Sequence, residues 1–218
     1  MRKLIYITCL FLGTFMLNAQ EADSDLLVVK ERLDSIIAFT ADLELNVDVS
    51  FINMPTKYAK MHYKKGSPVN FESDDFVMVP KRGLDLSMQE LFKNPFITVD
   101  RGKEEVNGTV LKKINIIPTN NKADFAIATL WIDTDVKRIE VSEINTKKNG
   151  TYKIFMNYNT SGAILPNKVI VSFEIEKIKL PIQYVAKNVE VDRKKMRKEA
   201  TKTGNFILNI SNYKIDKK

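Results

Sequence analysis

Residues 42–51 read Asp-Leu-Glu-Leu-Asn-Val-Asp-Val-Ser-Phe, so polar and apolar side chains alternate without a break. Successive side chains of an extended chain point to opposite faces, which places all the apolar residues of this stretch on one face. Pro55 follows and ends the pattern, because proline cannot donate to a sheet ladder. The stretch therefore predicts a half-buried strand in a sheet with one apolar and one solvated face.

The same alternation recurs further along the chain, separated by turn signals at hairpin spacing. Asn-Gly is favoured in tight hairpin turns because both central residues adopt positive φ, so Asn107-Gly108 predicts a hairpin. Residues 147–150 predict another. We find no repeated helical crossover between the strands, which argues against a parallel α/β sheet. The predicted strands are residues 96–106, 109–117, 136–144, 151–158, 169–175 and 206–210.

Two helices are predicted beside these strands. Residues 23–39 have the spacing of an amphipathic helix, with Ser24 or Asp23 as its cap. Residues 84–93 predict a shorter helix that Asn94-Pro95 ends. Their apolar positions are Leu26, Val29, Leu33, Ile36 and Ile37 in the first helix, and Leu84, Met88, Leu91 and Phe92 in the second.

The first nineteen residues have the features of a secretory signal peptide. Arg2 and Lys3 precede an apolar stretch, and Ala19 offers a small residue at the cleavage site. An uncleaved anchor helix is the less favoured interpretation, because the stretch is short for a membrane span. We expect residues 20–218 to form a single domain, exported to the periplasm and soluble after cleavage. Because Cys9 is the one cysteine, the mature chain would contain no disulfide.

Few residues are suited to catalysis or metal binding. A single histidine, His62, excludes zinc sites that need two imidazoles. We interpret Asp133-Thr134-Asp135 as a turn, not a calcium loop, and the pairs Asp74-Asp75 and Glu104-Glu105 as solvated surface, because neighbouring strand residues diverge. The sequence therefore predicts no catalytic residue, no metal site and no cofactor, and the protein is not expected to be an enzyme.

The order of these elements resembles the LolA-like outer-membrane lipoprotein-sorting proteins of Gram-negative bacteria. The resemblance implies an α+β fold, in which a curved antiparallel sheet forms an incomplete β-barrel and helices cover a hydrophobic cavity. It also implies non-covalent binding of lipoprotein acyl chains, a lipoprotein-releasing inner-membrane transporter and an outer-membrane acceptor as partners. The segments that carry it are 104–108, 114–118, 130–133, 150–151, 165–167 and 212–215.

The residues support such a cavity independently, since the two predicted helices are too small to cover the whole apolar face of the sheet. The uncovered part either fills itself with side chains, as in small barrels, or leaves a hollow. If it is hollow, we expect the lipid-binding residues to be Leu33, Ile36 and Ile37 of the helix with Leu45, Val47, Val49, Phe51, Ile154, Met156, Val171 and Phe173 of the sheet.

Two alternatives remain open on the same sequence. One is a sensing or regulatory module that binds lipid in the same cavity, and the other, less favoured, is an envelope hydrolase. The basic residues of the segment 187–204 predict a solvated loop or frayed helix, and they either solubilise the protein or make transient contact with a membrane surface. The net charge of +7 does not by itself indicate nucleic acid, which an exported protein rarely meets.

Overall fold

The computed structural model describes residues 22–74, 91–148, 150–175 and 187–218. The predicted signal peptide lies outside the described residues, as does most of the predicted helix 84–93, of which Leu91 and Phe92 are helical. The elements are α1 (Ser24–Asp34), β1 (Ile36–Asp48), β2 (Ile52–Asn53), β3 (Lys57–Lys64), β4 (Asn70–Glu72), β5 (Phe96–Val106), β6 (Thr109–Pro118), β7 (Phe125–Asp133), β8 (Arg138–Thr146), β9 (Gly150–Asn157), β10 (Lys168–Ile175), β11 (Glu190–Val191), α4 (Arg193–Lys198) and β12 (Lys202–Lys217).

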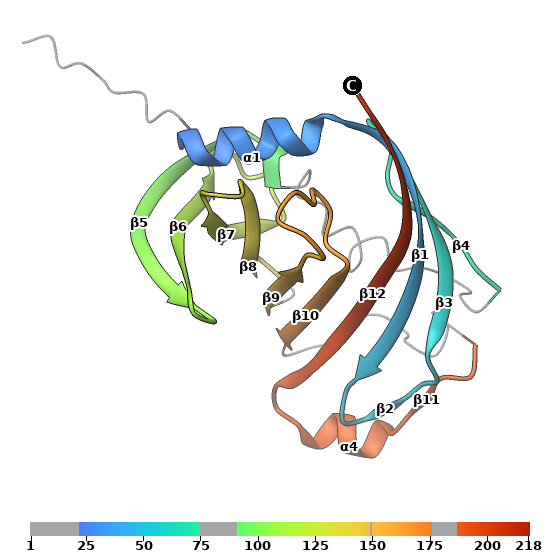
Figure 1. Cartoon of the computed structure of the whole chain (residues 1–218). Coiled ribbons are helices and arrows are strands. Elements are labelled where there is room, and N and C mark those ends of the chain that lie inside the picture. Colours follow the sequence, from blue (N-terminus) through green and yellow to red (C-terminus); the bar gives the residue numbers. More distant parts are fainter. Residues whose placement is uncertain (1–21, 75–90, 149, 176–186) are drawn as a thin grey trace, which may run out of the picture.

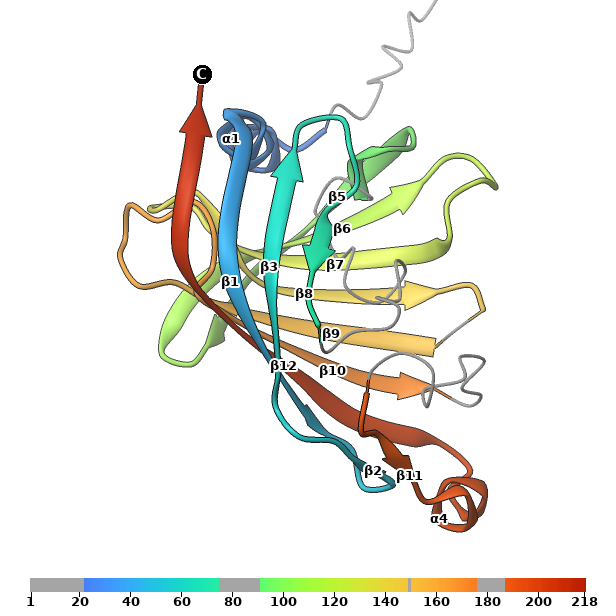
Figure 2. The same cartoon turned by 90° about the vertical axis from the view of Figure 1, so that its right-hand side faces the viewer.

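The long strands form one strongly curved antiparallel sheet (Figures 1 and 2). Its ten strands follow the order β4-β3-β1-β12-β10-β9-β8-β7-β6-β5, so the first and last strands of the chain pair with each other inside the sheet. β4 and β5 remain as edges, and the barrel is therefore incomplete. α1 lies across one end of it (Figure 1). This is the α+β incomplete barrel with a helical cover that the sequence predicted.

The alternation is confirmed for residues 42–48, which lie on β1 with Leu43 and Leu45 buried, but the strand ends at Asp48 and residues 50–51 form a turn. The predicted helix 23–39 was too long, however, because α1 ends at Asp34 and β1 begins at Ile36. Ser35 ends the helix, its hydroxyl donating to the Arg32 carbonyl at 2.7 Å. Two β-branched residues, Ile36 and Ile37, follow and favour extended backbone. Their spacing predicts that both residues continue the helix, but both belong to the strand.

The predicted hairpins are confirmed by their backbone geometry. Asn107 and Gly108 have φ of 53° and 80°, as the tight turn between β5 and β6 requires. β8 and β9 form the second hairpin, with Thr146 paired to Gly150. The segment 187–204, expected as a loop or frayed helix, contains β11, which pairs with β2, and the short helix α4.

The core has separate apolar clusters along the concave face. One packs Leu26 and Val29 of α1 against buried residues such as Ile114 and Leu130. Another lines β1, β3, β10 and β12 further along the sheet. A third, consisting of Val49, Phe51 and Phe173, lies beside β2, β11 and α4. α1 therefore closes one end of the apolar face, and side chains fill the end near α4.

Charged groups fix the N-terminal end of α1 on the sheet. Asp23 caps the helix by accepting from the backbone N–H of Asp25 and Leu26. Lys112 of β6 places its ammonium 2.7 Å from the Asp23 carboxylate and 2.6 Å from that of Asp25. Burial alone lowers the pKa of Lys112, but hydrogen bonds and charge from the two aspartates outweigh it and hold this pKa well above its usual value.

Replacing Lys112 with Leu should lower the free energy of unfolding by about 1–3 kcal/mol, because two carboxylates lose their shared cation. The pKa of Lys112 is raised in the folded state. Its contribution to the free energy of unfolding is therefore complete below about pH 10.4 and declines above that pH by up to about 1.4 kcal/mol per pH unit. Urea unfolding of both proteins across this range should show their difference shrinking. Lys113→Leu, which removes the more exposed pair with Glu104, should cost less than about 1 kcal/mol. Equal losses for both variants would contradict the anchoring role of Lys112.

Gly204 of β12 tests the packing at the other end of the sheet. A Cβ there would lie 2.5 Å from Val49 Cγ2 and 2.9 Å from the Asp48 carbonyl oxygen. Gly204→Ala should therefore destabilise the protein by about 1–3 kcal/mol in urea unfolding. Gly162→Ala, where a Cβ would meet nothing within 4 Å, should change stability by less than about 1 kcal/mol. A neutral Gly204→Ala would mean that this end is loosely packed.

Candidate functional site: an apolar cavity beneath the first helix

A cavity of about 200 Å³ lies between α1 and the concave face of the sheet. A volume of this size holds on the order of ten groups as large as a water molecule. Its lining is mostly aliphatic and aromatic, which is the character of a site for an apolar ligand. The lining residues are Val29, Arg32, Leu33, Ile36, Phe39, Met61, Tyr63, Val69, Lys137, Arg138, Ile139, Ser142, Ile154, Met156, Tyr158, Ile164, Leu165, Pro166, Val169, Leu208, Ile210 and Tyr213.

The structure brings four of the predicted site residues to this cavity, namely Leu33, Ile36, Ile154 and Met156. Ile37 is not among its walls, since it lies at a register shift between β1 and β12 and is 40% exposed. The remaining predicted residues are not part of the cavity walls and pack in the core, some of them in the same cluster as the lining residues Ile154 and Leu208. These remaining residues are Leu45, Val47, Val49, Phe51, Val171 and Phe173.

Several cavity residues were missed although part of their signal is visible in the sequence. Met61 and Tyr63 lie on β3, where buried and more exposed residues alternate. Leu208 and Ile210 lie on β12, within the predicted strand 206–210. The loop residues Ile164, Leu165 and Pro166 show no periodicity that could have placed them.

Stacked aromatic rings form the wall contributed by β1, β3 and β12. Phe39 stacks on Tyr63 with ring centroids 5.1 Å apart, and it meets Tyr213 edge-on at 5.7 Å. Burial raises the pKa of Tyr213, so its phenol stays protonated near neutral pH. Its hydroxyl donates to the Pro166 carbonyl at 2.8 Å, which leaves the ring to face the cavity.

Arg32 ties the C-terminal end of α1 to two loops. Its guanidinium donates to the backbone carbonyls of Val136 and Lys137 in the turn between β7 and β8. It also donates to Gly162 at 2.7 Å and to Ala163 at 3.4 Å, in the loop between β9 and β10. The Arg32 side chain thus connects α1 to the β7–β8 turn and to the β9–β10 loop beside the cavity.

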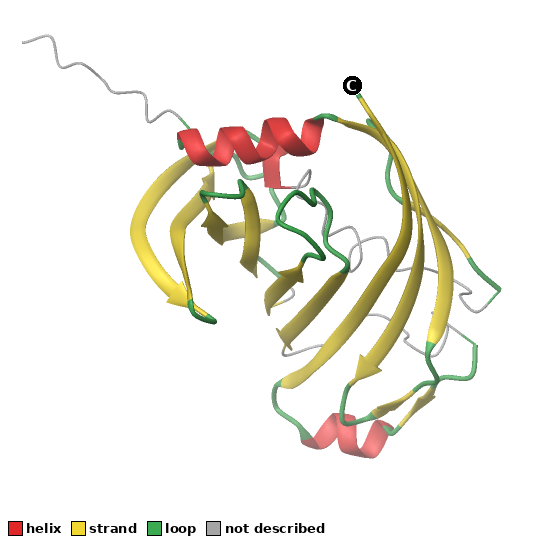
Figure 3. Ribbon diagram, viewed as in Figure 1, coloured by secondary structure: helices red, strands yellow, loops and turns green. Residues whose placement is uncertain are grey.

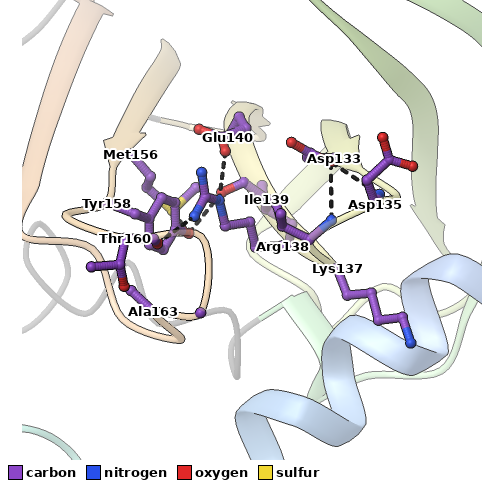
Figure 4. Close-up of polar contacts among 12 residues, drawn as sticks. Asp133, Asp135, Lys137, Arg138, Ile139, Glu140, Met156, Tyr158, Thr160 and Ala163 are labelled. Carbon is purple, nitrogen blue, oxygen red and sulfur yellow. Dashed lines mark hydrogen bonds and ion pairs between the residues drawn. The ribbon is translucent and has the colours of Figure 1, made fainter.

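A second set of contacts holds the β9–β10 loop in place (Figure 4). Arg138 lies over the Tyr158 ring at 4.3 Å and donates to the Glu140 carboxylate and the Thr160 carbonyl. The Tyr158 hydroxyl donates to the Ile139 carbonyl at 2.8 Å. Burial, reinforced by the Glu140 charge, raises the pKa of Tyr158 and keeps it a donor. The loop that Arg32 reaches is therefore itself anchored to β8.

The other residues considered from sequence lie away from the cavity. Asp133 accepts from the backbone N–H groups of Asp135 and Val136, which is the predicted turn (Figure 4). His62 faces Glu72 across the β3–β4 pair, 3.4 Å from its carboxylate. Glu104 pairs with Lys113, and this hydrogen bond lowers its pKa. Asp75 lies outside the described residues.

Within the described ranges, no three His, Cys, Asp or Glu residues gather as a metal site would require. Among the helices of those same ranges, none is long and apolar enough to cross a membrane.

Comparison with solved structures finds the same fold over most of the chain. An outer-membrane lipoprotein-sorting protein domain from Vibrio parahaemolyticus aligns with a TM-score of 0.51 and 12% identity, covering 88% of this chain and 92% of that one. A DUF1329 family protein from Desulfovibrio piger gives 0.53 and 12%, with coverage of 88% and 92%. A LolA superfamily protein from Nitrosomonas europaea gives 0.50 and 10%, with coverage of 88% and 94%.

Searches at the level of sequence give no match, either to a protein-family model or to a curated protein. The likeness is therefore one of fold, and the structural matches include LolA-superfamily proteins, as the sequence resemblance predicted.

Proposed function

We propose that this protein is a periplasmic carrier that binds the acyl chains of lipoproteins, or of another lipid, without a covalent bond and escorts them toward the outer membrane. The observation that supports the proposal most directly is the apolar cavity between α1 and the sheet. The described lining contains no carboxylate, cysteine or histidine, so it offers an acyl chain a place to bind but few groups for catalysis. An exported carrier would meet an inner-membrane lipoprotein-releasing transporter and an outer-membrane acceptor.

The way α1 is held provides a mechanism for entry and release. Its N-terminal end is fixed by the Lys112 ion pairs. Its C-terminal end is joined to β1 through Ser35 and contacts loop carbonyls through Arg32. This end also accepts a hydrogen bond from the Lys65 ammonium at the Asp34 carbonyl, 2.6 Å away. Ser35 alone joins this end of the helix to β1, so breaking the Arg32 contacts would let α1 tilt about Ser35, away from the two loops, and widen the cavity. An acyl chain would then enter between α1 and the concave face, and the helix would close on it.

The free energies of an acyl chain in the cavity and in a bilayer are of the same order. Full burial of about sixteen carbons gains at most about 13 kcal/mol, at about 0.8 kcal/mol per methylene, and the roughly ten groups for which the cavity has room would gain about 8 kcal/mol. A bilayer offers the same chain a gain of the same order, so a carrier can take cargo from one membrane and release it at another. The direction of transfer must then come from the partners.

Filling the cavity should weaken the binding of an acyl ligand. Met156→Trp places a larger side chain inside it, and we expect the affinity for a fluorescent fatty acid to fall at least about tenfold, since lost burial costs about 0.8 kcal/mol per excluded methylene. Phe155→Trp is the matched control, because Phe155 packs in the cluster of Leu111, Trp131 and Val141 on the opposite face of β9. Mass spectrometry of protein purified from its own envelope should also identify bound lipid. Unchanged affinity in Met156→Trp, with the fold intact, would refute the cavity as the binding site.

Removing the Arg32 hydrogen bonds should speed the release of cargo. In Arg32→Leu the helix loses its contacts with the two loops, and we expect stability to fall by about 1.5–3 kcal/mol, with faster amide exchange in α1. Stopped-flow transfer of a fluorescent fatty acid to vesicles should accelerate, while Lys30→Leu, which removes an ion pair within the helix, should leave the rate near that of the natural protein. If both variants release ligand at the same rate as the natural protein, α1 is not the element that opens.

The carrier and the sensor interpretations differ in the cell. Depletion of a carrier would remove lipoproteins from the outer membrane, whereas depletion of a sensor would leave them in place and change a response to them.

A further inference from the structure

Positive charge is concentrated at the end of the molecule opposite α1. Between residues 187 and 202 there are seven basic and three acidic side chains, a net charge of +4 within a chain whose total is +7. Five of the basic residues belong to α4, which lies at the far end of the sheet from α1 (Figure 3). They are Arg193, Lys194, Lys195, Arg197 and Lys198.

The basic side chains of α4 form a broad exposed arc. At about 100° per residue, the five positions span roughly 200° of the helix surface. Met196 points to the remaining side and packs against the cluster of Val49, Phe51 and Phe173. All five basic residues are exposed, and the large exposed apolar residues of the described chain lie elsewhere, on α1, β1, β3 and β6.

Contacts with the rest of the protein present this helix in a fixed position. Asp192 caps it by accepting from the backbone N–H of Lys194 and Lys195 at 3.0 and 2.9 Å. The Asp192 N–H donates to the Phe51 carbonyl at 2.9 Å, and the Lys195 ammonium to the Ser50 carbonyl at 2.8 Å. A six-residue helix is not stable alone in water, so these contacts are what keep its cations on one surface.

We propose that α4 docks the protein on a bilayer surface that carries anionic phospholipid headgroups. Clustered lysine and arginine side chains are attracted to such a surface without needing shape complementarity. A specific protein interface usually has an apolar centre, which the α4 surface lacks. Charge and shape therefore favour a membrane over a protein partner, and the inference does not depend on what the cavity holds.

Co-sedimentation of the full chain with vesicles tests this docking. We expect binding to phosphatidylcholine vesicles that contain roughly a third phosphatidylglycerol, little binding to phosphatidylcholine alone, and weakening of the binding as salt rises. The triple variant Lys194→Glu, Arg197→Glu, Lys198→Glu should lose at least about tenfold in vesicle affinity. A matched control with the same change in net charge is Lys103→Glu, Lys122→Glu, Lys148→Glu, whose positions are exposed and lie outside this segment. It should keep most of the binding, and melting curves should show that both variants fold.

The proposal is overturned if the natural protein does not prefer anionic vesicles, including the case in which it binds only an acidic protein. It is also overturned if the control loses as much affinity as the α4 variant, because net charge and not α4 would then be responsible. Fatty-acid binding, measured on the same proteins, should be unchanged in both variants. Absence of fatty-acid binding in the natural protein would refute the cavity function and leave the docking surface standing.

Discussion

The structure depends on a mismatch between a wide apolar sheet face and the short helix laid across it. Ten antiparallel strands curve around one concave side, and α1 contributes eleven residues to cover one end of it. Where Leu26 reaches the sheet, it packs among buried side chains, and Val29 lies at the border of the cavity. Beyond them, towards β1, β3 and β12, side chains line a hollow without filling it.

The N-terminal end of α1 is held to the sheet by ion pairs, whereas its C-terminal end continues into β1 through Ser35 and contacts two loops through Arg32. Lys112 binds carboxylates that it cannot leave without exposing uncompensated charge in a partly buried place. Arg32 binds neutral carbonyls, which water can satisfy equally well once the contact opens. Releasing the Arg32 contacts therefore costs less than breaking the Lys112 pairs, and Ser35 keeps this end of the helix attached to β1 as it moves. The difference in cost arises because Lys112 binds charged carboxylates and Arg32 binds neutral carbonyls.

The sequence predicted those features of the fold that are decided locally. Alternation at 42–48 identifies a strand because its period is a property of the extended chain, and Asn107-Gly108 identifies a turn because positive φ is a property of those two residues. The end of the helix at Ser35 could not be predicted, because Ile36 continues the helical spacing of Leu33. Ile36 belongs to the sheet because it pairs with Lys217, which is far away in the sequence.

The lining of the cavity was predicted only in part for a related reason. Leu45 and Ile154 both lie on the apolar concave side of their strands, yet only Ile154 lines the cavity, because the hollow occupies the end near α1 and sequence periodicity does not distinguish the ends. Arg32 could not be predicted at all. Its acceptors are backbone carbonyls more than a hundred residues away. Every residue has a backbone carbonyl, so the sequence does not indicate which of them accepts a hydrogen bond.

The separation of the cavity and the basic helix has a consequence for how such a carrier would work. α1 and α4 lie at opposite ends of the curved sheet (Figures 1 and 2). A protein held on a bilayer through α4 would therefore turn α1, and with it the cavity, away from that surface. Cargo could not then pass straight between the bilayer and the cavity, so it would have to be exchanged with another protein that reaches α1, or after α4 has left the surface. In either case, attachment and exchange are separate steps, because the groups that perform them are separated by the length of the sheet.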